Sequence, residues 1–385
     1  MDTFFNSVIW LPNPDIFSIS FLTVRWYGLL FALGFIIAQQ IMFYIYKKEG
    51  KPQRDVESLT IYMIIAVVIG ARLGHVLFYQ PEVYFADPIK ILKIWEGGLA
   101  SHGAAVGILV AILLYVNFYI NISFSKFKVK KRKRKDQSYL WVIDRIVIVV
   151  ALAGCLIRLG NLINSEIVGK PTNSNWGFVF AWEAKQLLLN DNLIDEVGVT
   201  KPDHSSIETP GAAEGLVPLQ FILKFVAGEG YYEEEDVRAY IENSIKQNLM
   251  YSYGEEHLEI ARDQPLNYTL DQKGGHYIAS VEVLGIARHP AQLYESIYYF
   301  LLFIALFLLW TKRKQHTPQG LIFGVFLIAL FGIRFIVEFL KENQVAFEDD
   351  LLLNMGQWLS IPFIIAGIVL LIYVFKKRKH SHSPE

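Results

Sequence analysis

Long runs of apolar residues, separated by polar segments, dominate the pattern of this chain. Each run is about 20 residues long, which is the length that a helix needs to cross the roughly 30 Å hydrocarbon core of a bilayer. Runs of this length with few charges indicate membrane spans rather than the core helices of a soluble domain. The pattern therefore predicts seven membrane-spanning helices, near residues 20–46, 57–79, 99–122, 139–160, 292–310, 319–340 and 356–375.

The composition agrees with a polytopic membrane protein. Of the 385 residues, 53% are hydrophobic and 14% are aromatic, and the mean hydropathy of +0.32 is too high for an ordinary soluble protein. The single cysteine, Cys155, excludes an intrachain disulfide and a cysteine-based metal cluster. We expect no cleavable signal peptide, because residues 1–19 lack a basic segment and contain Pro12 and Pro14.

Basic residues gather in every second loop between the apolar runs. Such loops stay on the cytoplasmic side of a membrane, so we predict that the N-terminus is outside and the C-terminus inside. The basic segments are residues 47–54, 126–135, 312–314 and 376–379. Segment 126–135 is also typical of a nucleic-acid-binding surface, but beside a membrane it is more simply an anchor that faces anionic lipid. We therefore expect no nucleic-acid partner.

One long polar segment separates the fourth and fifth runs, and the predicted topology places it outside the cytoplasm. Residues 176–182 and 275–283 are predicted to form strands, and residues 216–226 an amphipathic helix on the membrane surface. The fold class is thus an all-α polytopic membrane protein with a small mixed α/β extracytoplasmic head. The predicted parts are an N-terminal arm with helices one to four, the head, and helices five to seven with a cytoplasmic tail, at residues 1–160, 161–290 and 291–385.

Polar and ionisable residues recur near the predicted outer ends of the spans. A charge at the bilayer centre costs about 2.5–3.5 kcal/mol on insertion scales, so such residues usually face a cavity or a partner. An arginine at a helix end often does no more than reach for lipid headgroups. Here the polar residues recur at helical spacing, which favours a site for an anionic headgroup. They predict one polar cavity at the outer leaflet, formed by Tyr27, His102, Arg158, Asn161, Glu166, Arg288 and Arg334.

Several of these residues have a structural interpretation that the sequence leaves open. Tyr27 is equally typical of the aromatic belt at a membrane interface, and Arg334 could simply pair with Glu338, four residues on. His102 is flanked by small residues that leave room for a ligand, although a lone histidine is more often a hydrogen-bonded structural residue. Arg72 in the second run must be paired or hydrated, and the glycines around it permit close helix approach.

Taken in order, these motifs resemble those of bacterial prolipoprotein diacylglyceryl transferases across all seven predicted spans. The strongest match is the segment from Arg158 to Glu166, with Gly169 just beyond it. Each remaining match is weak alone, but the set follows the order of that family. These matches lie at residues 26–28, 97–103, 288–295, 334–339 and 355–362.

The chain departs from the family pattern at a few positions. Ala104 and Ser165 stand where the family usually has glycine, and Lys341 stands where a further arginine is common, which leaves phosphate contact at that position in doubt. The head segment is also longer than in familiar members. The resemblance says nothing about residues 187–275, which read as an acidic insertion.

The resemblance implies transfer of the diacylglyceryl group of phosphatidylglycerol to the thiol of a lipobox cysteine in a prolipoprotein signal peptide, with release of glycerol phosphate. This is the first step of lipoprotein maturation. It implies no metal or cofactor, and it places the protein in the bacterial cytoplasmic (inner) membrane with its active site toward the outer leaflet. The alternative is a lipid or solute transporter with an outer-leaflet anion site. A transporter would be expected to show an inverted repeat and broken helices, and the sequence shows neither.

The roles expected of the matched residues follow from their chemistry. Arg158 and Arg334 are expected to stabilise the phosphate of the leaving group, because a planar guanidinium binds phosphate better than an ammonium does. A thiol has a pKa near 8.5 and reacts as the thiolate, so a base is needed and His102 is the best candidate. The residues expected to bind and orient the substrate are Tyr27, Asn161, Glu166, Gly169, Arg288, Tyr294 and Glu338.

Overall fold

Two units of structure, each assembled from three separate stretches of the chain, make up the protein. The first, here called the sheet unit, consists of Met1–Leu29, Arg158–Glu295 and Ile336–Asn354. The second, the helical unit, consists of Leu30–Ile157, Ser296–Phe335 and Met355–Glu385. The computed structural model describes residues 7–19, 22–93, 98–123, 126–131, 133–174, 176–202, 215–226, 233–251, 257–342 and 351–380.

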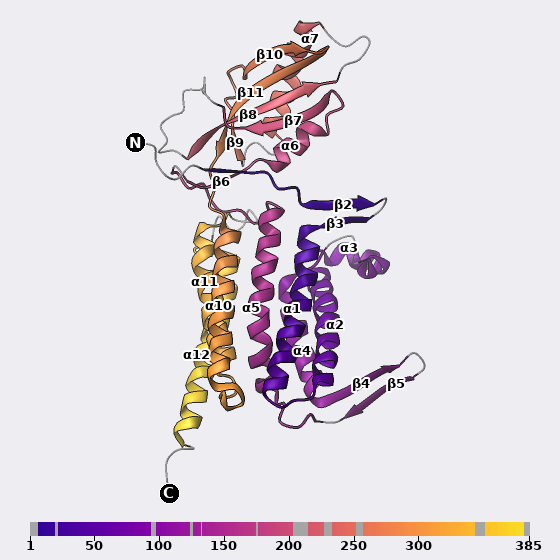
Figure 1. The fold of residues 1–385 in the computed structure, drawn as a ribbon, viewed down its shortest axis with the longest axis vertical. Coiled ribbons are helices and arrows are strands. Elements are labelled where there is room, and N and C mark those ends of the chain that lie inside the picture. Colours follow the sequence, from indigo (N-terminus) through magenta and orange to yellow (C-terminus); the bar gives the residue numbers. More distant parts are fainter. Residues whose placement is uncertain are drawn as a thin grey trace. The chain divides into compact units, whose positions relative to one another are not determined.

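Six of the described helices are long and apolar enough to cross a membrane, so the protein is a multi-pass membrane protein. They correspond to six of the seven predicted spans. The first of them begins at Trp26 rather than near residue 20, because strand β3 (Leu22–Arg25) precedes it. The six helices are α1 (Trp26–Lys48), α2 (Gln53–Phe78), α5 (Tyr139–Ile163), α10 (Ala291–Arg313), α11 (Leu321–Val337) and α12 (Met355–His380) (Figure 1).

The third predicted span, at residues 99–122, is helical over only part of its length. Helix α4 runs from Ser101 to Asn117, and its 17 residues extend about 25 Å, which is less than the roughly 30 Å core. The chain then continues as strand β4 (Phe118–Ser123), which pairs antiparallel with β5 (Lys126–Lys131). The prediction of helix as far as residue 122 is wrong, because the aromatic and β-branched residues after Asn117 favour a strand.

Helices α2 and α4 touch backbone to backbone. A Cβ atom added at Gly103 would lie 2.1 Å from the carbonyl oxygen of Gly70 and 2.7 Å from the Cα of Gly74. One added at Gly107 would lie 2.4 Å from the carbonyl oxygen of Ala66. The prediction that glycines permit close helix approach is confirmed, and the glycines that follow His102 serve this packing.

Arg72 on α2 is buried and binds backbone carbonyl groups. Its side chain holds the segment that follows α2, namely α3 (Pro81–Ala86) and the 3-10 helix η1 (Pro88–Leu92). Of the two alternatives expected for this arginine, paired or hydrated, the structure shows the first, with backbone carbonyl groups as the partners. Its guanidinium donates to the carbonyl oxygens of Ile91 at 2.9 Å, Lys93 at 3.1 Å, Gly98 at 3.2 Å and Lys90.

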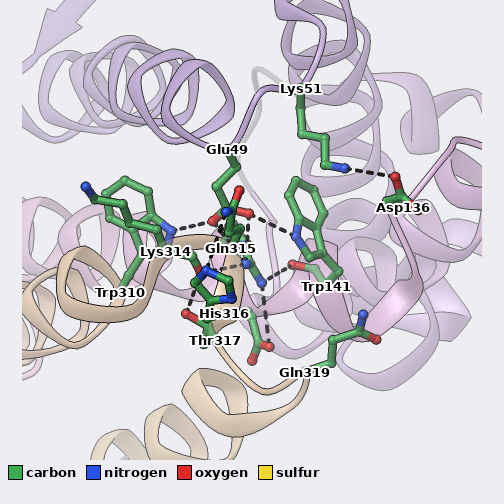
Figure 2. A network of polar contacts seen from close by, with 12 residues as sticks. Glu49, Lys51, Asp136, Trp141, Trp310, Lys314, Gln315, His316, Thr317 and Gln319 are labelled. Atoms are coloured by element: carbon green, nitrogen blue, oxygen red, sulfur yellow. Dashed lines mark hydrogen bonds and ion pairs between the residues drawn. The ribbon is translucent and has the colours of Figure 1, made fainter.

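A second buried polar cluster joins the turn after α1, the start of α5 and the turn after α10 (Figure 2). Glu49 pairs with Arg145 at 3.0 Å, and both side chains are fully buried. Trp141 donates to the same carboxylate at 3.0 Å, as does Trp310. Asp144 accepts two backbone N–H groups where α11 begins, at 2.7 and 2.8 Å. Breaking a buried pair of this kind usually costs about 3–5 kcal/mol, so the cluster fixes these helices to one another.

The sheet unit contains a five-stranded antiparallel sheet. Its strands follow the order β10, β11, β8, β7, and β9 also pairs with β11. A separate parallel pair joins β1 (Val8–Trp10) to β6 (Phe178–Phe180), and β2 (Asp15–Ile19) forms a hairpin with β3. The strand predicted at 275–283 is confirmed by β11, whereas the one predicted at 176–182 is confirmed only at residues 178–180, where β6 lies, because Trp182 already belongs to a helix. The main strands are β7 (Ile194–Thr200), β8 (Leu216–Phe225), β9 (Leu258–Glu259), β10 (Asn267–Lys273) and β11 (His276–Ile286).

Short helices pack against this sheet and complete its core. They contribute Leu188, Val237, Ile241 and Leu249, which are buried against strand residues such as Phe221. The burial of these apolar side chains gives the sheet unit a hydrophobic core of its own. The helices are α6 (Trp182–Leu189), α7 (Glu234–Tyr240), the π-helix η4 (Ile241–Ile245) and α8 (Lys246–Tyr251).

The prediction of an amphipathic helix at residues 216–226 is wrong. These residues form β8, which pairs with β11 on one side and β7 on the other. Leu219, Phe221, Leu223 and Phe225 are buried, whereas the residues between them are only half-buried. This alternation has the period of two that belongs to a strand and not the 3.6 of a helix.

Candidate active site

Charged side chains join the end of α5, the start of α10 and the 3-10 helix η6 (Glu338–Leu340) within the sheet unit. The Nε of Arg158 lies 2.7 Å from one carboxylate oxygen of Glu295, and the Nζ of Lys341 lies 3.1 Å from the other. Lys341 also pairs with Glu338 at 3.0 Å. The Glu295 side chain is fully buried, whereas the Arg158 side chain is 14% exposed. The Arg158 side chain is thus held by a buried carboxylate and is not fully buried itself.

The network continues from Arg158 into the segment after α5. Its guanidinium donates to the side-chain oxygen of Asn161 at 3.3 Å, and the Asn161 amide donates to Glu166 at 3.1 Å. Asn164 donates to the other oxygen of Glu166, also at 3.1 Å. Arg158 and Asn161 are three residues apart and so share one face of the helix. The helical spacing noted in the sequence therefore produces real contacts, and Glu166 remains exposed.

Left-handed backbone at Ser165 and Ile167 turns the chain after α5. Their φ angles are 55° and 60°, a conformation that glycine adopts most easily. Ser165, one of the departures noted in the sequence, thus lies in a backbone conformation that favours glycine. The turn carries the Glu166 carboxylate back toward Asn161, and the side-chain amide of Gln292 on α10 donates to the backbone carbonyl of Glu166.

Two cations and one carboxylate form the buried centre of this network. A buried charge is tolerated only when it is paired, and Glu295 has Arg158 and Lys341 as its two partners. Lys341 is 3% exposed, and its ammonium lies between Glu295 and Glu338. Phosphate contact at Lys341, left in doubt by the sequence, would therefore compete with two carboxylates. Arg158 is the more accessible cation of the two.

Gly169 lies where three stretches of backbone meet. Its N–H donates to the carbonyl of His289 at 2.9 Å, and the next N–H, of Lys170, donates to the carbonyl of Leu340 at 2.7 Å. Arg288 is buried and donates to the carbonyl of Gly169 at 3.1 Å. Arg288 also pairs with Glu342 at 2.8 Å. These contacts tie the loop after α5 to the start of α10 and to the end of η6.

A Gly169→Ala substitution is expected to destabilise the protein by about 1–3 kcal/mol. Its Cβ would lie 2.5 Å from the carbonyl oxygen of His289 and 2.7 Å from that of Leu340, and neither backbone can easily move. Thermal unfolding of the purified variant measures the effect. Gly198→Ala is the matched control, because a Cβ there meets its nearest neighbour at 3.4 Å. Equal stability of the two variants would contradict the tight packing at Gly169.

Two tyrosines predicted to bind substrate lie in the sheet unit as well. Tyr27 packs on Gly160, where an added Cβ would lie 2.8 Å from its ring. The Tyr294 hydroxyl lies 3.2 Å from Nδ1 of His289, and the His289 ring packs edge-on against Trp176 with centroids 5.5 Å apart. Burial lowers the pKa of His289, which favours its neutral form. Both tyrosines thus have defined positions.

The other two predicted site residues, His102 and Arg334, belong to the helical unit. His102 is an exposed side chain in the first turn of α4, and Arg334 is half-buried in the last turn of α11. The positive charge of Arg334 interacts electrostatically with the His102 imidazole. Gly98 precedes α4 with a φ of 72°. Gly97, from the same motif, lies outside the described residues.

All of these residues lie within a stretch that matches one protein family. The sequence profile of the family described as prolipoprotein diacylglyceryl transferase matches residues 14–373. The chain belongs to this family.

Curated relatives match the chain over nearly its whole length. One from Tolumonas auensis is 34% identical over 373 residues, which cover 96% of this chain and 99% of that protein. One from Chloroherpeton thalassium is 34% identical over 377 residues, with 98% and 97% covered. One from Bacteroides fragilis is 31% identical over 390 residues, with 98% and 99% covered. All three are named phosphatidylglycerol–prolipoprotein diacylglyceryl transferase.

In this member of the prolipoprotein diacylglyceryl transferase family, three residues contact the predicted site residues, and the sequence did not identify these contacts. Glu295 and Lys341 hold Arg158 and Glu338, and Gln292 holds the backbone at Glu166. A signal was present for Glu295, because a carboxylate in the first turns of an apolar helix needs a cation. Which cation it takes depends on contacts between distant segments, which the sequence pattern does not give.

Proposed function

We propose that this chain transfers the diacylglyceryl group of phosphatidylglycerol to the cysteine thiol of a prolipoprotein. The match of the family profile to residues 14–373 carries this proposal. In the reaction the thiol sulfur bonds to the glyceryl carbon and the bond from that carbon to the phosphate oxygen breaks. The products are a thioether and glycerol phosphate. The thiol proton passes to a base and then to the phosphate or to water.

The leaving phosphate gains charge as it departs, so its stabilisation is the main electrostatic task of the site. Arg158 and Arg334 are the residues to which we assign it, because each presents a planar fork of donors that fits phosphate oxygens. For Arg158 the support is its position: the buried Glu295 carboxylate pairs with the guanidinium, and the Arg158 side chain is 14% exposed. A preorganised cation of this kind needs little rearrangement when charge develops.

Proton removal from the thiol is the second task, and we assign it to His102. An imidazole titrates near neutrality and so suits a base that takes and returns a proton. Its exposure in the first turn of α4 supports this role. The residues that we assign to binding and orienting the lipid headgroup are Tyr27, Asn161, Glu166, Gly169, Arg288, Tyr294 and Glu338.

The transfer assay itself tests the proposal. Purified protein in micelles or vesicles is given phosphatidylglycerol and a peptide that contains a lipobox cysteine, and the thioether product is followed by mass spectrometry. We expect the peptide to gain one diacylglyceryl group and glycerol phosphate to appear in equal amount. Movement of lipid across vesicles without peptide modification would favour a transporter instead.

The sheet unit and the active site are proposed to face outward from the bacterial inner membrane. The support is charge. The ends of α1, α10 and α12 that carry Lys47, Lys312 and Lys376 lie at one end of the helical unit, as does the β4–β5 hairpin (Figure 1). Basic segments of this kind remain in the cytoplasm, which leaves residues 161–290 outside.

This topology predicts opposite labelling of two exposed positions. In a variant with Cys155 replaced by alanine, Lys135→Cys should react with a membrane-impermeant maleimide only after the inner membrane is opened. Glu235→Cys should react in intact spheroplasts, because α7 would lie outside. Both positions are exposed, so access is limited by the membrane and not by burial. Reversed labelling at either position would overturn the orientation.

A further inference from the structure

An open groove of about 900 Å³ runs along the contact between α2 and α4 in the helical unit. We call it the α2–α4 groove. Small residues form its floor, where the backbones of the two helices touch. Membrane helices approach one another most closely on surfaces of this kind. The floor residues are Ala66, Gly70, Gly74, Gly103 and Gly107.

Two rows of apolar side chains form the walls of the groove. Within each row the residues are four apart, so each row is a ridge along its helix. All of them are 41–62% exposed. A groove between two such ridges is a geometry into which a third helix packs. The rows are Ile61, Ile65, Ile69, Leu73 and Leu77 on α2, and Val106, Val110 and Leu114 on α4.

The length of the groove matches a helix better than a lipid chain. It follows α2 from Arg54 in the first turn to Phe78, the last residue. At 1.5 Å per residue this is a rise of about 36 Å, compared with roughly 30 Å for the hydrocarbon core. An acyl chain reaches only the middle of a bilayer and would leave half of the groove empty. The apolar ridge on α2 runs from Ile61 to Leu77, a rise of about 24 Å, and the apolar region of a signal peptide, up to about 15 residues long, rises about 22 Å.

The two ends of the groove differ in their chemistry. His102, the proposed base, lines one end. The carboxylate of Glu57 lines the other end beside Arg54, and both are exposed. A secretory signal peptide begins with a basic region, continues with an apolar helix and ends at its processing site. With its basic region toward the end that Arg54 and Glu57 line, such a peptide would bring its cysteine to the end that His102 lines.

We propose that the α2–α4 groove docks the signal-peptide helix of the prolipoprotein, with the apolar face of the peptide on the two ridges and its cysteine beside His102. The proposal rests on the transferase function proposed above and adds the site at which the thiol substrate binds.

The test fills the groove without disturbing the core. In the double variant Ile69→Trp/Val110→Trp, both exposed ridge residues become bulky indoles. We expect the KM for a peptide that contains a whole signal sequence to rise at least about tenfold, because side-chain packing in the groove is lost. The KM for phosphatidylglycerol should change by less than about twofold. Val369→Trp on α12 is the matched control, since Val369 is 60% exposed and lies outside the groove.

The possible outcomes separate this proposal from the function on which it rests. An active wild-type enzyme together with an unchanged peptide KM in the double variant would overturn the groove proposal alone. A higher KM for phosphatidylglycerol only would show that acyl chains occupy the groove, and would overturn it too. Absence of transfer by the wild-type enzyme would contradict the function itself.

A crosslinking experiment serves if the double variant folds poorly. A photoreactive residue at position 106, in a groove wall, should capture the signal peptide, whereas one at position 369 should not. Equal capture at both positions, or capture at neither, would overturn docking in the groove.

Discussion

Replacing Arg158 by lysine is expected to lower transfer by about 10²–10³-fold in a protein that remains folded. Lysine keeps the positive charge that the buried carboxylate of Glu295 requires, so no charge is left unpaired. It loses the planar fork of donors that binds two phosphate oxygens at once. The loss should therefore fall on the transition state, where the phosphate leaves, and lower kcat more than it raises the KM for lipid.

Arg25→Lys is the matched control for this prediction. Arg25 also belongs to the sheet unit and pairs with Asp15 at 3.0 Å, but its side chain is 61% exposed. Exposed ion pairs contribute roughly 0–1 kcal/mol, so this variant should keep the activity of the wild type. Thermal unfolding of both variants shows whether either has lost its fold. Near-normal transfer by Arg158→Lys would mean that Arg158 serves only as the countercharge of Glu295.

A Glu295→Gln variant separates orientation from direct contact with phosphate. The amide keeps the shape of the side chain but removes the charge that holds Nε of Arg158 and Nζ of Lys341. If Glu295 positions Arg158, kcat should fall. Thermal stability should fall as well, because two cations lose their shared partner. Unchanged kcat with lower thermal stability would assign Glu295 a purely structural role.

The hydrophobic pattern was enough to predict most of the helices, and it failed where the chain left the membrane. Apolar runs of about 20 residues have few alternatives to a spanning helix, so α5 and α12 lie close to their predicted limits. The apolar residues of segment 216–226 fit both the 3.6-residue period of a helix and the two-residue period of a strand. Only its pairing with β7 and β11 decides between them, and that pairing joins residues far apart in the sequence.

The candidate site shows the same division between local and distant contacts. Arg158, Asn161 and Glu166 were predicted as a group from their spacing, and the structure connects them by hydrogen bonds. Their partners Glu295 and Lys341 come from α10 and from the end of η6. No periodicity links these positions. A polar residue within an apolar run indicates that a partner is needed. The identity of that partner depends on how the chain folds.

Replacing His102 by glutamine is expected to lower transfer at neutral pH by about 10²–10⁴-fold, the usual contribution of a general base. Glutamine keeps a polar side chain of similar size and cannot take up a proton. The natural comparison is His316→Gln, because His316 is exposed in the same unit and lies in the turn after α10. That variant should retain full activity.

The pH dependence then distinguishes a base from a positioning group. Without His102, transfer depends on the fraction of substrate cysteine that ionises unaided, and a thiol has a pKa near 8.5. Raising the pH from 7 to 9 increases that fraction roughly 25-fold, so the His102→Gln rate should rise by a similar factor. The wild-type rate should change much less over the same range, because its base already removes the proton. A His102→Gln rate that stays flat to well above pH 8.5 would mean that His102 positions the substrate, and Glu166, the exposed carboxylate at the end of the Arg158 network, would be the next base to test.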